Sequence, residues 1–279
     1  MQAINLLPDC LDCARRAGQA IMEVYAGDFS VQHKDDDSPL TRADLASHHI
    51  IADHLHALTP DIPLLSEESA AIDWDTRQRW QRYWLIDPLD GTKEFVKRNG
   101  EFTVNIALIE QHRPVLGVVL APVLNTYWFA VSGAGAQRLQ TDSLQDLANM
   151  QQAEAIRVRQ PPATPPVVIA SRSHASAELQ QYLQQLPAHE ILSVGSSLKF
   201  CRVAEGSADL YPRLGPTSEW DTAAAQAVVE QAGGQVLAAA GTALEYNRKA
   251  SLLNPHFLVI GDHQHDWPQL PPPPQAEPI

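Results

Sequence analysis

The stretch that decides the fold of this chain is Trp84-Leu85-Ile86-Asp87-Pro88-Leu89-Asp90-Gly91-Thr92-Lys93-Glu94-Phe95. An apolar run leads into Asp87, and a proline and then a glycine interrupt it. This pattern predicts a buried strand that carries Asp87 and Asp90 to the edge of a sheet. Two such carboxylates repel each other and lose hydration, so they indicate a bound cation. Because the ligands are all oxygens, a hard ion such as Mg²⁺ is favoured, and metal-assisted chemistry on phosphate is the first hypothesis.

The composition is that of an ordinary globular protein with a marked excess of acids. The chain has 279 residues, of which 44% are hydrophobic, and 33 Asp and Glu outweigh 20 Lys and Arg for a formal charge of -13. This length gives one large domain or two modest ones. The charge argues against binding of a nucleic-acid polymer, which needs a basic face. A small anionic substrate stays compatible with it, provided that metal and a few local cations reverse the potential in one cleft.

The cysteines and the apolar runs bear on the compartment. Cys10 and Cys13 lie one helical turn apart without a second pair of ligands, so we interpret them as small residues of one helix. With Cys201 they imply no disulfide framework, which favours a reducing compartment. The N-terminus lacks a leader pattern, and the best apolar run, residues 115–124, is short and interrupted. We therefore expect a cytoplasmic protein without a membrane-spanning segment, and peripheral association with the inner face of the membrane is left open.

Residues 1–159 are predicted to form an α+β half with antiparallel strands. Apolar residues at helical spacing, with stop signals at Gly27 and Pro60, predict two long helices. Three later runs with short connections predict an antiparallel meander. The predicted elements are helices over 6–25, 41–58 and 75–83, and strands over 62–65, 84–87, 102–110, 114–120 and 126–131.

A proline-rich linker, residues 160–166, separates this half from a second one. Strands and helices then alternate, which predicts an α/β half over residues 160–261. Its predicted elements are strands over 167–171, 191–194, 208–214 and 256–260, and helices over 175–186, 197–205 and 222–232. Residues 262–279 include a run of prolines and are predicted to be a disordered tail. The fold class is therefore α+β followed by α/β, packed about a shared cleft.

Four acidic side chains are candidates for the cation site: Glu67, Asp87, Asp90 and Asp221. Three of them have a plain structural alternative. An acid after a strand is commonly solvated, Asp-Gly is an ordinary turn pair, and an acid that opens a helix can cap it. Asp87 is harder to explain without a ligand, because it directly follows a run that should be buried.

Asp44 is ambiguous in the same way. In Thr41-Arg42-Ala43-Asp44 it resembles the last residue of a capping box. An acid at the start of a helix could instead take a proton from a hydroxyl across a cleft. Thr92, two residues beyond Asp90, is the candidate hydroxyl partner.

Three strings resemble the signature of the inositol monophosphatase superfamily, a group of metal-dependent and typically lithium-sensitive phosphomonoesterases. They are Ser66-Glu67-Glu68-Ser69, Asp87-Pro88-Leu89-Asp90-Gly91-Thr92 and Trp220-Asp221-Thr222-Ala223-Ala224, in the superfamily's order and at its approximate spacing. The resemblance extends over about residues 6–261. It implies a layered αβαβα sandwich of the inositol monophosphatase and fructose bisphosphatase type.

The resemblance also implies roles for individual residues. The ligands of Mg²⁺ would be the carboxylates of Glu67, Asp87, Asp90 and Asp221 and the backbone carbonyl of Leu89. Four carboxylates supply four negative charges, which two Mg²⁺ ions offset while they stay able to bind phosphate. Asp44 and Thr92 would position and deprotonate the attacking water, without a phosphoenzyme. Backbone N–H groups near Gly91 and Thr92 could hold phosphate oxygens if a helix starts there.

Within the superfamily, Gly91-Thr92-Lys93-Glu94-Phe95 resembles the 3'(2'),5'-bisphosphate nucleotidase branch. A second resemblance to that branch lies in residues 195–200 and 208–213. It implies that Ser196, Lys199 and Arg213 contact the nucleotide and its second phosphate, which needs a cationic clamp away from the metals. The predicted substrate contacts are Glu67, Leu89, Asp90, Gly91, Thr92, Ser196, Lys199, Arg213 and Asp221.

That branch converts adenosine 3',5'-bisphosphate to AMP and phosphate and serves sulfate assimilation, and the prediction extends to release of adenosine 5'-phosphosulfate from its 3'-phosphorylated form. An inositol monophosphatase or a broad sugar phosphatase on the same scaffold is the nearest alternative. An inactive regulator that binds nucleotide or metal is a more remote one. The partner is a small nucleoside bisphosphate, and the oligomeric state, monomer or homodimer, is left open.

One position departs from the superfamily pattern. Glu219 directly precedes Trp220-Asp221, where the superfamily usually has an apolar residue. An additional carboxylate beside a predicted ligand either alters the affinity for metal or points to solvent.

Overall fold

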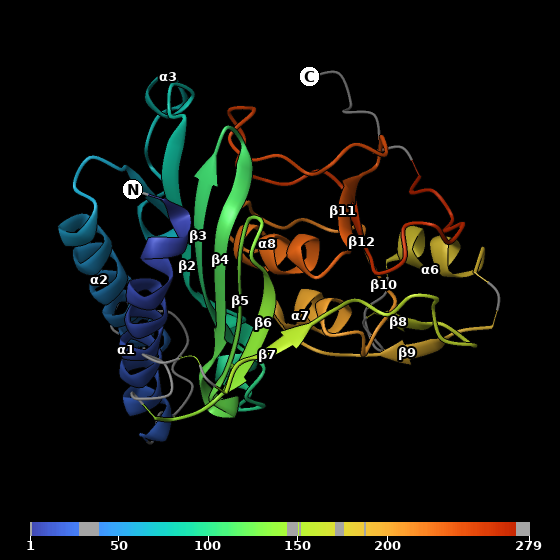
Figure 1. Ribbon diagram of the computed structural model, residues 1–279, viewed down its shortest axis with the longest axis horizontal. Coiled ribbons are helices and arrows are strands. Elements are labelled where there is room, and N and C mark those ends of the chain that lie inside the picture. The colour runs from blue at the N-terminus through green and yellow to red at the C-terminus, as the bar shows by residue number, and fades with distance from the viewer. Residues whose placement is uncertain are drawn as a thin grey trace.

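The computed structural model describes residues 2–27, 39–143, 150, 152–170, 176–186 and 188–271. Helices and sheets alternate in layers across the molecule (Figure 1). Helices α1 (Leu7–Ala26) and α2 (Pro39–Leu58) cover one face of a seven-stranded sheet, and α7 (Leu198–Ala204) and α8 (Ala223–Gln231) pack on the other. A five-stranded sheet and then α6 (Ala177–Leu183) complete the stack. This arrangement confirms the predicted αβαβα sandwich.

The seven-stranded sheet has its strands in chain order, from β1 to β7. Only β1 and β2 are parallel, and all later neighbours are antiparallel. Short turns connect β3 to β4, β4 to β5 and β5 to β6, as is common between antiparallel neighbours. The strands are β1 (Leu64–Ser66), β2 (Arg82–Asp90), β3 (Thr103–Glu110), β4 (Arg113–Ala121), β5 (Thr126–Val131), β6 (Gly135–Gln140) and β7 (Glu154–Ile156). The predicted meander is thus confirmed as β3, β4 and β5.

The five-stranded sheet has the order β11-β12-β10-β8-β9. Strands β8, β9 and β10 are parallel, as expected for strands joined by helices, and β12 runs antiparallel to both of its neighbours. The strands are β8 (Val167–Ile169), β9 (Glu190–Leu192), β10 (Leu210–Arg213), β11 (Gln235–Ala238) and β12 (Phe257–Ile260).

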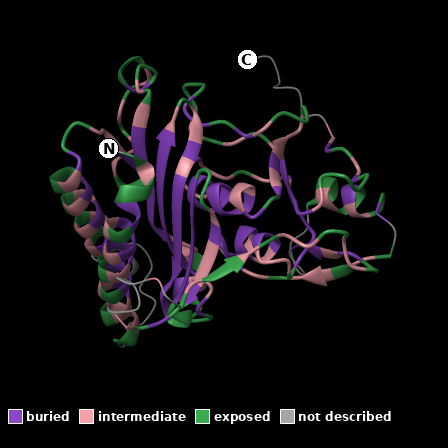
Figure 2. Ribbon diagram, in the orientation of Figure 1, coloured by how far each residue is buried: buried purple, intermediate pink, exposed green. Residues whose placement is uncertain are grey.

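The largest buried cluster lies between the two sheets, around α7 and α8 (Figure 2). Helix α8 approaches β4 closely because small side chains meet there. A Cβ atom added to Gly117 would lie 2.1 Å from the carbonyl oxygen of Ala224 and 2.8 Å from the Cβ of Ala227. Only glycine therefore allows this contact between sheet and helix.

Two local predictions differ from the structure. The helix expected over residues 75–83 is a single turn, α3 (Trp74–Arg77), and β2 already begins at Arg82. Cross-strand pairing of Arg82 with Glu110, whose side chains form a 2.9 Å ion pair, extends β2 toward its N-terminus. Strands β6, β7 and β11 were not predicted, because none of them is a continuous buried apolar run.

The tail predicted to be disordered from residue 262 is ordered through residue 271. Trp267 and Leu270 are buried against the outer face of the five-stranded sheet. The hydroxyl of Tyr182 in α6 donates to the carbonyl of Pro268 at 2.9 Å. Two apolar side chains thus hold this proline-rich segment in place, and the prediction was wrong for residues 262–271. Residues 272–279 lie outside the described part of the chain.

The division of the chain at residues 159 and 160 stays a prediction. Strand β7 before it and β8 after it belong to different sheets. The linker between them is fixed by Asp209, whose carboxylate accepts two hydrogen bonds from Arg159, at 2.8 and 2.7 Å. The backbone N–H groups of Ala163 and Val167 donate to the same carboxylate.

Candidate metal centre

The end of strand β2 presents Asp87 and Asp90 on one face of the sheet. In a regular strand, residues three apart point to opposite faces. Here Asp87 pairs with Asn105 and Asp90 pairs with Thr103, so β2 has one more residue than β3 in this interval. This bulge at Pro88-Leu89 changes the phase of the strand and turns both carboxylates toward α7 and α8.

The Asp87 carboxylate is held at one oxygen and unpaired at the other. The backbone N–H of Leu89 donates to its Oδ1 at 3.0 Å, which fixes the turn. Its Oδ2 has no hydrogen-bond partner among the described residues, although the residue is only 1% exposed. Burial, and then the neighbouring carboxylates of Asp90 and Glu67, raise the pKa of Asp87 well above its usual range. From α2, the Ser47 hydroxyl donates to the carbonyl of Pro88 at 2.8 Å and holds the bulge.

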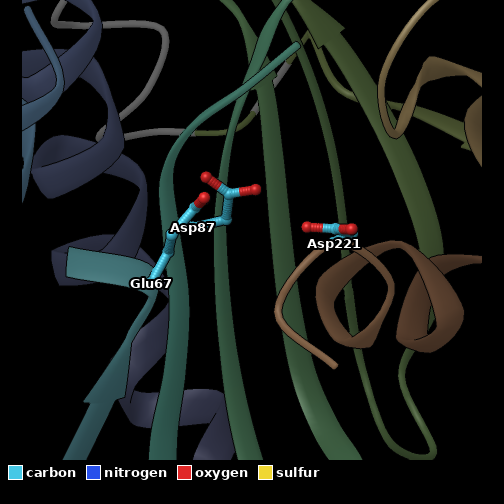
Figure 3. A group of neighbouring side chains, drawn as sticks. All are labelled: Glu67, Asp87 and Asp221. Atoms are coloured by element: carbon cyan, nitrogen blue, oxygen red, sulfur yellow. The ribbon is translucent and has the colours of Figure 1, made fainter. Parts of the chain in front are cut away.

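Glu67 and Asp221 complete a three-carboxylate group with Asp87. One oxygen from each of the three side chains lies within 4.8 Å of the others (Figure 3). Glu67 follows β1, and because β1 is parallel to β2 the carboxyl ends of both strands meet at one edge. Asp221 comes from the opposite side, just before α8, and burial raises its pKa to about 7. This group forms the centre of the candidate site.

Asp90 lies beside the three-carboxylate group and is tied to the second half of the chain. Its Oδ2 accepts hydrogen bonds from the Ser197 backbone N–H at 2.6 Å and from the Ser197 hydroxyl at 2.9 Å. The same hydroxyl lies 2.9 Å from the backbone carbonyl of Asp221, and it can donate to only one acceptor at a time. Ser197 is therefore a site residue that the sequence did not reveal.

Asp44 projects from α2 toward Glu67 and Glu68. It is 8% exposed, and its Oδ1 has no partner in the described part of the chain. Burial, followed by the charges of Glu68 and Glu67 and a hydrogen bond with Glu68, raises the pKa of Asp44 to about 8. Sequence reasoning missed Glu68 as its neighbour, although Glu68 stands beside Glu67 in the signature string. The predicted pairing of Asp44 with Thr92 stays a prediction.

The turn after Asp90 packs closely against the backbone of Glu101 and the side chain of Ser196, with Gly91 at the contact. Helix α4 (Thr92–Val96) begins at Thr92, directly after Gly91 with φ of 94°. A Cβ on Gly91 would lie 3.1 Å from the carbonyl oxygen of Glu101 and 3.2 Å from the Cβ of Ser196, so both backbone conformation and space require glycine. The Leu89 side chain is fully buried in the cluster that includes α1 and α2, and its carbonyl stays a predicted ligand.

The two predicted cations lie near the acidic residues but bond to their own loops. The Lys199 ammonium donates to the carbonyl of Ser196 at 3.1 Å. The Arg213 guanidinium donates to the carbonyls of Gly215 at 3.1 Å and Pro216 at 2.5 Å. Burial raises the pKa of both Asp90 and Asp221. The charge of Lys199 partly offsets this rise for Asp90, and the charge of Arg213 does so for Asp221.

Glu219 is buried at 2% exposure, so the alternative that it points to solvent is wrong. Its Oε2 accepts a hydrogen bond from the Asn247 backbone N–H at 2.9 Å. The Asn247 side chain exchanges two hydrogen bonds with Arg77 of α3, each 2.6 Å long. Burial raises the pKa of Glu219 to about 7, although Asn247, Lys249 and Arg77 lower it. Through its hydrogen bond with Asn247, the Glu219 side chain holds the segment that precedes Asp221. It does not belong to the three-carboxylate group.

These residues fit a divalent metal ion. The donor set consists of carboxylate oxygens, which suit hard cations. Asp87 Oδ2 is a buried anionic atom without a partner, and a bare charge in that position is costly unless a cation compensates it. The predicted ligands Glu67, Asp87 and Asp221 are brought together, and Asp90 lies next to them.

Three comparisons with known proteins agree with this geometry. A sequence profile of the inositol monophosphatase family matches residues 9–266. The 3'(2'),5'-bisphosphate nucleotidase CysQ of Salmonella typhimurium is 54% identical, over 91% of this chain and 99% of its own length. The crystal structure of CysQ from Bacteroides thetaiotaomicron superposes with a TM-score of 0.80 at 41% identity, covering 91% of this chain and 96% of that one.

A more distant structure shares the fold alone. An inositol monophosphatase from Zymomonas mobilis superposes with a TM-score of 0.74 at 22% identity, covering 95% of this chain and 96% of that one. None of the described helices is both long and apolar enough to cross a membrane. The profile match and the 54% identity extend over nearly the whole chain. The chain belongs to the inositol monophosphatase family.

Proposed function

We propose that this protein is a Mg²⁺-dependent phosphomonoesterase that hydrolyses adenosine 3',5'-bisphosphate to AMP and phosphate. The observation that carries the proposal is the three-carboxylate group of Glu67, Asp87 and Asp221, where one edge of the seven-stranded sheet meets the start of α8. The relative from Salmonella typhimurium, 54% identical, bears the name of a 3'(2'),5'-bisphosphate nucleotidase. By the same chemistry, the 3'-phosphate of 3'-phosphoadenosine 5'-phosphosulfate would also be released. The proposed role is in sulfate assimilation.

Glu67, Asp87, Asp90, Asp221 and the carbonyl of Leu89 would hold the metal. Their four carboxylates match the charge of two Mg²⁺ ions. When bound, the ions would stabilise negative charge on phosphate oxygens and lower the pKa of a bound water. Ser197 holds Asp90 in place for this role, and the backbone N–H of Leu89 does the same for Asp87.

Asp44 and Thr92 are proposed to handle the attacking water. Asp44 is buried beside Glu67, and its Oδ1 is free to accept a proton from a water in that position. The Thr92 hydroxyl, at the first residue of α4, would orient the same water. The residues of the chain thereby supply a proton acceptor and a positioning group next to the metal ligands.

Lys199 and Arg213, together with Ser196, are proposed to bind the second phosphate of the substrate. Both cations are half-buried near the metal centre. In the structure each donates to carbonyls of its own loop, so substrate phosphate would replace weaker acceptors with a charged one. Inositol 1-phosphate lacks this second phosphate and would leave the cations unused.

The three described cysteines are free and buried, which suits the reducing cytoplasm that we propose as the compartment.

The proposed substrate is tested by a direct comparison. Phosphate release from adenosine 3',5'-bisphosphate, inositol 1-phosphate and fructose 1,6-bisphosphate would be measured under equal Mg²⁺. We expect the highest kcat/KM for the nucleotide. Faster turnover of inositol phosphate would instead establish an inositol monophosphatase, and no release from any substrate would favour an inactive binding protein.

Lys199→Met is expected to reduce the preference for the bisphosphate. Loss of one charge-assisted contact costs about 1.5–3 kcal/mol, so kcat/KM for the nucleotide should fall about 10- to 100-fold, mainly through KM. Turnover of a phosphomonoester without a second phosphate should change little. Lys97→Met, which removes an exposed lysine, is the matched control. An equal loss on both kinds of substrate would contradict the assignment of Lys199 to the second phosphate.

The metal-free protein is expected to become less stable as the pH rises from about 5 to about 8. Folding raises the pKa of Asp221 to about 7 and that of Asp44 to about 8, chiefly through burial. The unfolded values are about 4, so the folded protein binds more protons in this interval, and its stability falls as those protons leave. Urea midpoints in EDTA would show the decline, and saturating Mg²⁺ should reduce it to the smaller part that the buried Glu219, whose pKa is also raised to about 7, contributes. A flat pH profile in EDTA would contradict the prediction.

A further inference from the structure

Asn105, in the middle of β3, is a buried amide without hydrogen bonds. The residue is 1% exposed. Neither its Nδ2 nor its Oδ1 has a partner among the described residues. A buried carboxamide can make several hydrogen bonds, and one that makes none costs stability, so its presence calls for a physical explanation.

The strand register places Asn105 directly opposite Asp87. The two residues are cross-strand partners of the antiparallel pair β2 and β3. Directly opposed side chains lie on the same face of the sheet, with their Cβ atoms about 4.5–5.5 Å apart. The unpaired amide of Asn105 is therefore the neighbour of a carboxylate whose Oδ2 is also buried and unpaired.

The polarity of this face of β3 follows the positions of the acids. Thr103 is opposite Asp90, and its hydroxyl lies 3.5 Å from Asp90 Oδ2. Asn105 is opposite Asp87. The next residue on the face, Ala107, is opposite Leu85 and is apolar, as is Ile109 beyond it. On this face of β3, polar side chains therefore occur only opposite an aspartate of β2. This placement indicates that they interact with the two carboxylates, because packing alone would not require polar residues there.

We propose that Asn105 is a positioning residue of the metal centre, and that its Nδ2–H donates to the Asp87 carboxylate when that carboxylate holds a cation. The inference rests on the metal centre of the proposed function. A bound cation fixes the orientation of the carboxylate, and a donor from β3 then holds it in that orientation. Without a cation the amide stays unpaired, so the same side chain weakens the metal-free protein and strengthens metal binding.

Asn105→Thr and Asn105→Val test the role of the donor, because the two variants have the same shape and differ only in a hydroxyl. Both are β-branched and suit a strand. Thr126→Val makes the same exchange of hydroxyl for methyl elsewhere in this sheet, where the buried Thr126 donates to the carbonyl of Leu124 at 2.9 Å. Mg²⁺ affinity of the full chain would be measured by calorimetry, and metal-free unfolding by circular dichroism.

We expect Asn105→Val to weaken Mg²⁺ binding about 10- to 100-fold, the range typical for groups that orient metal ligands. Metal-free, this variant should unfold at a higher temperature than the wild type. Asn105→Thr should bind Mg²⁺ at least about 5-fold more tightly than Asn105→Val. Thr126→Val should leave the affinity unchanged and lower the unfolding temperature.

Equal Mg²⁺ affinities of the Val and Thr variants would overturn the inference, whether or not both are weaker than the wild type. If Asn105→Val does not fold, Asn105→Ala takes its place as the variant without a donor, and equal Mg²⁺ affinities of Asn105→Ala and Asn105→Thr would overturn the inference as well. A wild-type protein that binds no Mg²⁺ would instead refute the proposed metal centre itself.

Discussion

Asp87→Asn is expected to lower kcat/KM by about 10³-fold or more while the protein keeps its fold. The substitution removes a negative charge from the centre of the acidic group, and a metal clamp contributes several kcal/mol to phosphoryl transfer. The amide oxygen can still accept the hydrogen bond from the Leu89 N–H, so the turn should persist. In the metal-free state the variant should be at least as stable as the wild type, because it no longer buries an ionisable carboxyl and its repulsion with Asp90 and Glu67 is relieved.

The measurement combines phosphate release with Mg²⁺ calorimetry and unfolding in EDTA. Asp61→Asn, which neutralises an exposed aspartate, is the matched control and should change none of the three. Full activity of Asp87→Asn would show that the metal centre has been placed wrongly. Loss of activity together with loss of the folded state would show a structural role.

Gly117→Ala should destabilise the protein by about 3 kcal/mol or more, at the upper end of the cost of overpacking a core. The new Cβ would lie 2.1 Å from the Ala224 carbonyl oxygen, so α8 must move away from β4. Because Asp221 directly precedes α8, the same movement separates its carboxylate from those of Glu67 and Asp87. We therefore expect weaker Mg²⁺ binding in the molecules that stay folded.

Urea unfolding and Mg²⁺ titration of the activity would measure the two effects of Gly117→Ala. Gly133→Ala is a useful control, since Gly133 has φ of 79° and a Cβ there would meet nothing within 4 Å. It should cost about 1–2 kcal/mol for its left-handed backbone without changing the response to Mg²⁺. A Gly117→Ala protein as stable as the wild type would mean that β4 and α8 adapt more easily than their contact suggests.

The sequence predicted most of the strands and the candidate acids because both depend on local patterns, whereas the layered sandwich was expected from the resemblance to the superfamily. The apolar run before Asp87 and the alternation of the meander describe single strands, and the structure confirms them. Sequence spacing alone did not reveal how residues three apart reach one face, because the bulge depends on pairing with β3. The tail was misjudged because proline content outweighed the two apolar side chains that anchor it.

Contacts between residues that are distant in sequence could not be predicted, for a different reason. Ser196 and Ser197 are adjacent and chemically alike, and only the backbone distinguishes their roles. Ser196 has φ of 44°, and Ser197 directs both its N–H and its hydroxyl to Asp90, 107 residues away. The burial of Glu219 likewise depends on Asn247 and Arg77, which are distant in sequence and meet only in the folded protein.

The bulge at Pro88-Leu89 has a consequence for how this site can change in evolution. Two aspartates separated by one residue would also share a face of a regular strand, but every backbone group between them would then pair in the ladder. The extra residue removes backbone groups from the ladder, and the Leu89 carbonyl is proposed as a ligand. Amino-acid replacement cannot delete a main-chain oxygen, so position 89 can vary among apolar residues that fill the buried space. Only a deletion, by shortening the chain there, would take this oxygen away.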